Sequence, residues 1–185
     1  DLLESRGLGD VYKRQLVNRE QDEEFIIAMV QRAKELGFRS TNLDLIYGLP
    51  KQTQALFAET LKQVLEMKPG RLSVFNYAHM PQLFAAQRKI KDEDLPKAEE
   101  KMAILQDTIE TLTGAGYQFI GMDHFALPED ELAVAQREGV LHRNFQGYTT
   151  QGECDLVGFG VSAISMVGDS YAQNQKELKK YYAQV

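Results

Sequence analysis

Three polar positions interrupt or follow short apolar segments, where the binding groups of α/β proteins usually lie. Asp44 stands between Leu43 and Leu45, residues 76–79 (NYAH) follow a second apolar segment, and residues 122–124 (MDH) follow a third. In parallel α/β folds, ligands bind at the carboxyl ends of the strands. A carboxylate among buried apolar neighbours must be paired or must face a polar ligand. The sequence does not decide whether Asp44 contacts a ligand or is a capping or salt-bridged residue.

The three histidines could each serve as a general base, a ligand donor or an ordinary polar residue. His79, His124 and His142 lie far apart in the sequence, and no pair has the spacing typical of metal ligands. Cys154 is the single cysteine. We therefore expect no cysteine-cluster metal site formed by this chain alone.

Residues 141–152 (LHRNFQGYTTQG) are the most unusual stretch, because they combine cations, amides and two aromatic rings with two glycines. Arg143 can bind a carboxylate through its planar fork, and the two rings can pack on a flat ligand. This combination indicates a loop that recognises an anionic, partly flat ligand. The alternative is a surface loop in which Arg143 pairs with a protein acid such as Glu153 or Asp155.

A glycine-containing segment follows at residues 158–163 (GFGVSA). It comes late in the chain and no helix is expected to begin at Ala163, so it is a weak match to a dinucleotide-binding loop. We interpret Gly158 and Gly160 as positions where the backbone approaches a neighbour or a ligand closely.

The spacing of apolar residues predicts the elements that position these groups. We expect strands at residues 41–46, 72–77, 117–121 and 156–161, and helices that begin near Asn18, Thr53, Pro96, Pro128 and Gln175. The apolar faces predicted for the first helix and for the long helix after Pro96 are Phe25, Met29, Ala33 and Leu36, and Met102, Leu105, Ile109 and Leu112.

Strands and helices that alternate in this way predict an α/β fold with a parallel sheet and crossover helices. A complete eight-stranded barrel takes about 250 residues, so a chain of 185 residues suits part of a barrel or a small open sheet. Residues 1–15 (DLLESRGLGDVYKRQ) show no period. We expect them to be a non-native or divergent lead-in, the alternative being a strand and loop before the first helix.

The composition narrows the class of protein. Hydrophobic residues make up 43% of the chain and charged residues 26%, which is typical of a soluble globular protein. No apolar run approaches the roughly 20 residues of a membrane span. The formal net charge of −6 gives no electrostatic reason to expect nucleic acid or an anionic membrane surface as a partner. We expect a cytoplasmic protein that is a monomer.

Five segments, taken together and in this order, are specific. They are residues 17–21 (VNREQ), 42–50 (NLDLIYGLP), 75–79 (FNYAH), 121–125 (GMDHF) and 142–150 (HRNFQGYTT). They resemble the oxygen-independent coproporphyrinogen III oxidases (dehydrogenases) of the radical S-adenosylmethionine (SAM) superfamily. The resemblance covers the chain after residue 15.

The resemblance implies that residues 16–185 are the distal half of a partial, TIM-like (β/α) barrel, incomplete at both ends. It implies a [4Fe-4S] cluster, two SAM molecules and an electron donor that the sequence does not identify. The implied reaction uses radicals from SAM to decarboxylate two propionates of coproporphyrinogen III to vinyl groups. The product is protoporphyrinogen IX, an intermediate in haem biosynthesis.

The resemblance also carries over four SAM contacts. Arg19, Asp44 and Ala78 correspond to contacts to the second SAM molecule, and Ile164 corresponds to a contact to the first. Arg143 is our candidate for binding a substrate carboxylate. The CxxxCxC motif that binds the family's cluster belongs upstream of this chain, so we expect no metal ligands here and no activity from the chain alone.

Two alternatives remain at this point. The first is a haem chaperone of the same superfamily, a binding protein whose signature resembles HNxxYW, although this chain has no Trp. The second is a stand-alone, non-catalytic α/β module. The sequence assigns no catalytic acid or base.

Overall fold

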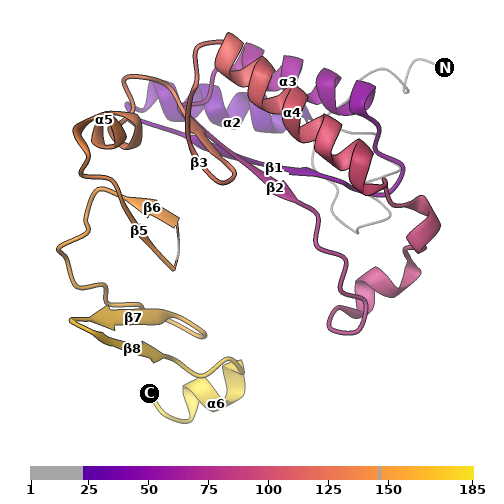
Figure 1. The fold of residues 1–185 in the computed structure, drawn as a ribbon. Coiled ribbons are helices and arrows are strands. Elements are labelled where there is room, and N and C mark those ends of the chain that lie inside the picture. The colour runs from indigo at the N-terminus through magenta and orange to yellow at the C-terminus, as the bar shows by residue number, and fades with distance from the viewer. Residues whose placement is uncertain (1–22, 146) are drawn as a thin grey trace. The chain divides into compact units, whose positions relative to one another are not determined.

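The structure, a computed structural model, describes residues 23–145 and 147–185. The chain divides into two compact units, with the boundary between Gly139 and Val140. Figure 1 shows the helices and strands of each unit. The predicted lead-in and the predicted helix start at Asn18 lie outside the described residues.

The first unit contains most of the regular structure. Its elements in chain order are α2 (Glu23–Glu35), β1 (Asn42–Tyr47), α3 (Gln54–Met67), β2 (Arg71–Asn76), the short 3-10 helices η1 (Ala85–Lys89) and η2 (Asp92–Asp94), α4 (Ala98–Gly114), β3 (Gln118–Gly121), β4 (His124–Ala126) and α5 (Glu131–Glu138).

The four strands form one mixed sheet in the order β1-β2-β4-β3. β1 and β2 are parallel and are connected through α3, which confirms the predicted crossover unit. β4 is antiparallel to both of its neighbours, so the prediction of an all-parallel sheet is wrong. The strand predicted at 117–121 is β3, and it continues through a tight turn at Met122, where φ is 50°, into a strand of three residues that the sequence did not predict.

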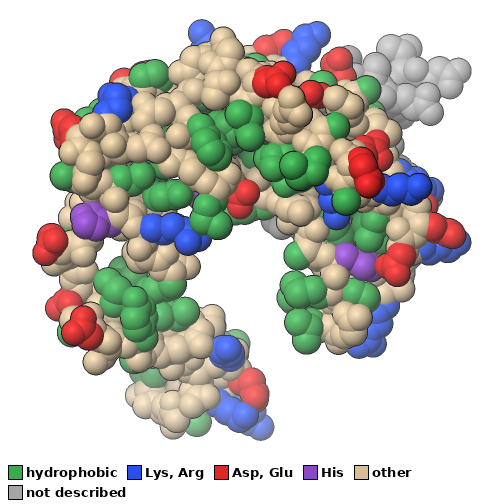
Figure 2. Space-filling view, viewed as in Figure 1, with side chains coloured by type: hydrophobic (Ala, Val, Ile, Leu, Met, Phe, Trp, Pro, Cys, Tyr) green, Lys and Arg blue, Asp and Glu red, His purple; other side chains and the backbone are tan. Residues whose placement is uncertain are grey.

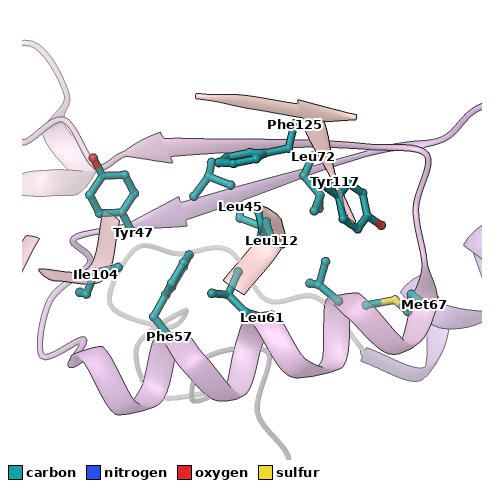
Figure 3. Packing of buried hydrophobic residues seen from close by; sticks show 12 residues of the cluster. Leu45, Tyr47, Phe57, Leu61, Met67, Leu72, Ile104, Leu112, Tyr117 and Phe125 are labelled. Atoms are coloured by element: carbon teal, nitrogen blue, oxygen red, sulfur yellow. The ribbon is translucent and has the colours of Figure 1, made fainter. Parts of the chain in front are cut away.

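The core lies between the sheet and helices α3 and α4. Leu45 and Tyr47 of β1 pack in one cluster with residues of α3 and α4. Figure 3 shows Phe57 and Leu61 pointing from α3 toward the two parallel strands. Side chains alternate along a strand, so the residues between these core positions face the other side of the sheet.

Two predicted helix faces are displaced from the observed ones. On α4, Leu112 is buried as predicted, but Met102 is 64% exposed, and the buried Ile104 and Thr108 were not part of the predicted face. Leu105 and Ile109 are partly buried and pack against the core, as predicted.

On α2 the displacement is larger, because Phe25, Met29 and Leu36 are all exposed. Val30 is buried instead, and Ile26 and Ile27 pack against the core. The predicted face of α2 is therefore wrong, and the packed stripe lies about one residue further along the helix.

The observed helix starts agree better with those predicted from the sequence. Thr53 caps α3, and its Oγ1 accepts a hydrogen bond from the Leu56 N–H at 3.4 Å. Asp130 caps α5 by accepting from the Leu132 N–H at 2.9 Å. The same carboxylate accepts from Arg71 Nε at 2.9 Å, which joins the start of β2 to α5.

The second unit consists of two hairpins and a short helix. β5 (His142–Asn144) pairs with β6 (Gly147–Thr149), β7 (Ile164–Val167) pairs with β8 (Ser170–Gln173), and α6 spans Leu178–Tyr182. The helix is shorter than the one predicted to begin near Gln175.

The strand predicted at 156–161 is wrong. Leu156 makes an isolated bridge to Met166, and no regular strand follows it. Phe159 is 90% exposed, and Gly160 has a φ of 97°. A backbone with positive φ at that position leaves the extended conformation that a strand requires.

Among the described residues, no helix combines the length and the apolar character needed to cross a membrane.

Replacing Leu112 by Ala should lower the free energy of unfolding by about 2–5 kcal/mol, because a buried leucine leaves a cavity. Met102→Ala on the same helix should change it by less than about 0.5 kcal/mol, because that side chain is exposed. Urea titration of the two variants followed by circular dichroism measures both values. Equal losses would show that Met102 packs in the core, as the predicted face of α4 requires.

Candidate functional site

The sheet face opposite α3 and α4 carries Asp44. Its carboxylate is exposed, and Oδ1 accepts a hydrogen bond from Asn42 Nδ2 at 2.7 Å. Asn42 also lies 3.1 Å from Ser73 Oγ, across the β1–β2 ladder. None of the ion pairs among residues 23–145 and 147–185 includes Asp44. The salt-bridged alternative is therefore not observed, and the carboxylate keeps acceptor capacity for a ligand.

The third predicted segment, residues 122–124, lies beside β2. His124 pairs in register with Ser73, and its ring packs edge-on against Phe75 with the centroids 6.0 Å apart. The Asp123 carbonyl accepts from the Val74 N–H at 2.7 Å. The antiparallel strand thus brings this segment to the same sheet as Asp44, although it does so by a route that the sequence did not predict.

A buried glutamine shapes the loop that leaves β1. Gln52 Oε1 accepts from the N–H groups of Gly48 and Leu49 at 2.7 and 3.2 Å, and its Nε2 donates to the Ile46 carbonyl at 3.4 Å. No motif or spacing in the sequence identifies Gln52. The only signal was its place two residues after Pro50.

Gly48 is required in that loop for two reasons. Its φ is 82°, which is unfavourable for residues with a side chain. A Cβ at this position would also lie 3.1 Å from Asn76 Oδ1 and 3.1 Å from Lys101 Cε. The exit of β1 therefore packs closely against the end of β2.

The loop that leaves β2 is tied to the first by a backbone hydrogen bond. The Tyr77 N–H donates to the Tyr47 carbonyl at 2.8 Å. Ala78 is exposed, and its carbonyl accepts from Gln87 Nε2 at 3.0 Å. His79 Nε2 lies 3.3 Å from Asp92 Oδ1, and His79 Nδ1 lies 3.5 Å from the Tyr77 hydroxyl.

Two phenols at these strand ends have raised pKa values. Burial raises the pKa of Tyr77. Burial, together with the nearby Asp123 carboxylate, raises the pKa of Tyr47. Both environments disfavour the phenolate, so each hydroxyl stays protonated well into the alkaline range and can donate a hydrogen bond.

Within the described part of the chain, no three His, Cys, Asp or Glu side chains are grouped so that they could hold a metal ion. Cys154 is exposed, and its Sγ lies 3.5 Å from Gln151 Oε1. An iron–sulfur cluster needs several thiolates. The residues present therefore do not fit a [4Fe-4S] cluster.

Arg143 lies on β5 of the second unit, directly opposite Tyr148 on β6. Its guanidinium carbon is 6.0 Å from the centroid of the Tyr148 ring, within the range of a cation–π contact. No ion pair to Glu153 or Asp155 is present among the described residues. Asp155 Oδ1 instead accepts from the Gly168 N–H.

On the face shown in Figure 2, acidic and basic side chains are interspersed rather than separated by sign. With a formal net charge of −6, recognition of an anion has to come from individual cations such as Arg143.

Ile164 is half-buried at the start of β7. A Cβ on Gly158 would lie 2.5 Å from the Ile164 carbonyl oxygen, and the Gly158 N–H donates to Ser165 Oγ at 3.0 Å. For Gly158 the predicted close backbone approach is thereby confirmed, the neighbour being the backbone of β7. For Gly160 it is wrong, because no described atom would lie within 4 Å of a Cβ there.

The expected site residues divide between the two units. Asp44 on β1 and Ala78 in the loop after β2 belong to the first unit, and Ile164 and Arg143 belong to the hairpins of the second. Arg19 lies outside the described residues.

The chain is similar to known proteins over nearly all of its length. Oxygen-independent coproporphyrinogen III oxidase from Salmonella typhimurium is 72% identical over 183 residues, which is 98% of this chain and 40% of the relative. The protein of the same name from Escherichia coli gives the same values. The one from Pseudomonas aeruginosa is 56% identical over 172 residues, 93% of this chain and 37% of that protein.

A solved structure agrees with these relatives. Coproporphyrinogen III oxidase from Escherichia coli, described as a radical SAM enzyme, matches with a TM-score of 0.92 and 72% identity. The match covers 96% of this chain and 41% of that one. No protein-family model matches the chain. The chain thus spans about 40% of the length of the relatives from Salmonella and Escherichia coli.

Replacing Gln52 by Leu should remove the amide protection of Gly48 and Leu49 and lower the free energy of unfolding by at least about 2 kcal/mol. Two N–H groups would lose their partner, at about 1–3 kcal/mol each where they are buried. Hydrogen exchange followed by NMR measures the two amides. Gln54→Leu, at an exposed position two residues later, is the control and should leave both amides protected. Unchanged exchange in Gln52→Leu would refute the role of this side chain.

Proposed function

We propose, from the premise that this chain is a close homologue of a segment of the oxygen-independent coproporphyrinogen III oxidases, that it forms the distal part of a radical SAM catalytic barrel. The intact protein would decarboxylate two propionates of coproporphyrinogen III and yield protoporphyrinogen IX. The observation that carries the proposal is the 72% identity over 98% of the chain, with a TM-score of 0.92 to a radical SAM enzyme.

The parallel β1–α3–β2 unit supports the barrel part of the proposal. Helices α3 and α4 cover one face of the strands, while the face with Asp44 has exposed polar residues. In a (β/α) barrel, helices cover the outside of the strands and ligands bind near the strands' carboxyl ends. Residues 16–185 would form the distal half, with residues 1–15 as a separate lead-in.

The residues of the first unit fit SAM. The exposed Asp44 carboxylate can accept a hydrogen bond from a ribose hydroxyl or from an amine. Ala78 offers only its backbone and a methyl group, which suits a backbone or van der Waals contact. Arg19 would hold a carboxylate, and Ile164 would contact the other SAM molecule. When bound, SAM supplies the one-electron chemistry that removes hydrogen from the substrate.

The residues of this chain do not fit the [4Fe-4S] cluster, so its ligands would come from another part of the intact protein. The electron donor stays unidentified, and we expect a cytoplasmic monomer. The relatives compared above are named as oxidases, which favours the oxidase over the haem chaperone.

Substrate recognition would fall to the second unit. The Arg143 guanidinium is exposed and lies near the Tyr148 ring. Such a pair can bind a propionate through the planar fork while the ring packs beside a pyrrole.

The test of the function is an anaerobic assay of the full-length protein. Incubated with coproporphyrinogen III, SAM and a reductant, it should release two molecules of carbon dioxide per protoporphyrinogen IX. Haem bound tightly without any decarboxylation would favour the chaperone instead.

Asp44→Asn in the full-length protein should weaken SAM binding by roughly ten- to a hundredfold. The substitution preserves shape but removes a charged hydrogen bond worth about 1.5–3 kcal/mol. Equilibrium dialysis without reductant measures the dissociation constant. Glu59→Gln, on the exposed surface of α3, is the matched control and should bind SAM normally. If Asp44→Asn also binds normally, Asp44 does not contact SAM.

Arg143→Lys should abolish most of the decarboxylation while uncoupled cleavage of SAM continues. Lysine keeps the positive charge but not the planar fork, and the SAM contacts are unchanged. Chromatographic assay of porphyrin products and of 5′-deoxyadenosine separates the two activities. Arg39→Lys, at an exposed position of the first unit, should retain both. A parallel loss of both activities would indicate a structural role for Arg143.

A further inference from the structure

The segment between β2 and α4 is mostly exposed, yet it is hydrogen-bonded to the loops that follow β1 and β2. We call residues 80–94, which include η1 and η2, the strap. Ile90 is its one buried residue. Its polar groups nevertheless reach the loops that follow β1 and β2. A segment with so small a core contribution is held mainly by these polar contacts.

Gln87 makes the most specific of them. Its Nε2 donates to the Ala78 carbonyl at 3.0 Å, and its Oε1 accepts from the Met80 N–H at 2.5 Å. One carboxamide therefore bonds to the backbone on both sides of His79. The geometry resembles a backbone turn that is closed by a side chain.

The strap is also anchored at its far end. The Asp94 carbonyl accepts from the Lys51 N–H at 2.6 Å, next to the loop that leaves β1. Asp92 lies 3.3 Å from His79 Nε2, but its side chain is 93% exposed. An ion pair with one fully exposed partner contributes little, whereas Gln87 makes two hydrogen bonds to the backbone around His79.

The position of Ala78 depends on what holds its backbone. A methyl side chain has no polar atom with which to find a ligand, so any contact that Ala78 makes to SAM is set by where its backbone lies. On one side the Tyr77 N–H is bonded to the Tyr47 carbonyl. On the other side the Ala78 carbonyl is bonded to Gln87.

We propose that Gln87 is a positioning residue for SAM, because it holds the Ala78 loop in the binding conformation. This inference rests on the proposed function, in which Ala78 contacts SAM. In this role Gln87 acts on SAM through the Ala78 carbonyl and the Met80 N–H, to which it is hydrogen-bonded.

The test measures SAM affinity and thermal stability of the full-length protein, without reductant. Gln87→Met removes both hydrogen bonds and keeps the volume, and should weaken SAM binding about tenfold without lowering Tm. Gln87→Glu keeps the oxygen that accepts from Met80 but cannot donate to Ala78, and should bind SAM as weakly as Gln87→Met. Gln82→Met, at an exposed position of the same strap, is the matched control and should bind SAM normally.

The Ala78→Phe variant distinguishes a failure of the role of Gln87 from a failure of the proposed contact between Ala78 and SAM. If Ala78→Phe weakens binding and Gln87→Met does not, the role of Gln87 is refuted while the proposed SAM site stands. If Ala78→Phe has no effect, Ala78 does not contact SAM and the inference fails with that premise. An affinity loss in Gln87→Met that appears only together with a lower Tm would also overturn the inference, because it would show a general structural role.

Discussion

The parallel pairing of β1 with β2 is the constraint on which both the core and the candidate site depend. In its register, Asp44 lies opposite Ser73 and Leu45 lies opposite Val74. Because side chains alternate along each strand, this single register sends leucine and valine toward α3 and α4 and sends the carboxylate to the other face. A slip of one residue would exchange the two faces completely. The forces that bury the core therefore also fix the position of the polar face.

The two exit loops extend this constraint beyond the sheet. The bond from the Tyr77 N–H to the Tyr47 carbonyl joins them, and Gln52 and Gln87 bind their backbones from either side. Both glutamines are neutral, and they satisfy backbone groups that lie beyond the end of the β1–β2 ladder. The shape of this end of the sheet thus depends on amide hydrogen bonds, which salt and pH affect less than ion pairs.

The elements with a long, clear period were predictable from the sequence, and the shorter ones were not. A strand of three residues such as β4 is too short to show a period. On α4, helical spacing is met equally by two adjacent stripes, and the polar Thr108 belongs to the buried one because its hydroxyl donates to the Ile104 carbonyl at 2.6 Å. Asp44 and Arg143 were predicted from residue type and position, whereas Arg19, Ala78 and Ile164 came from the family resemblance. Gln52 and Gln87 were not predicted, because a glutamine that hydrogen-bonds to the backbone produces no recognisable spacing in the sequence.

β1 pairs on one side with β2 and, among the described residues, has no strand on its other side. Such an edge presents a row of N–H and C=O groups to solvent and can recruit a strand from another molecule. Six residues that include Leu43, Leu45 and Ile46 provide a surface suited to that association. In a longer protein an additional strand can occupy this edge. A preparation limited to residues 23–185 would carry this edge unpaired, and edge-to-edge association would then limit its solubility independently of the stability of its core.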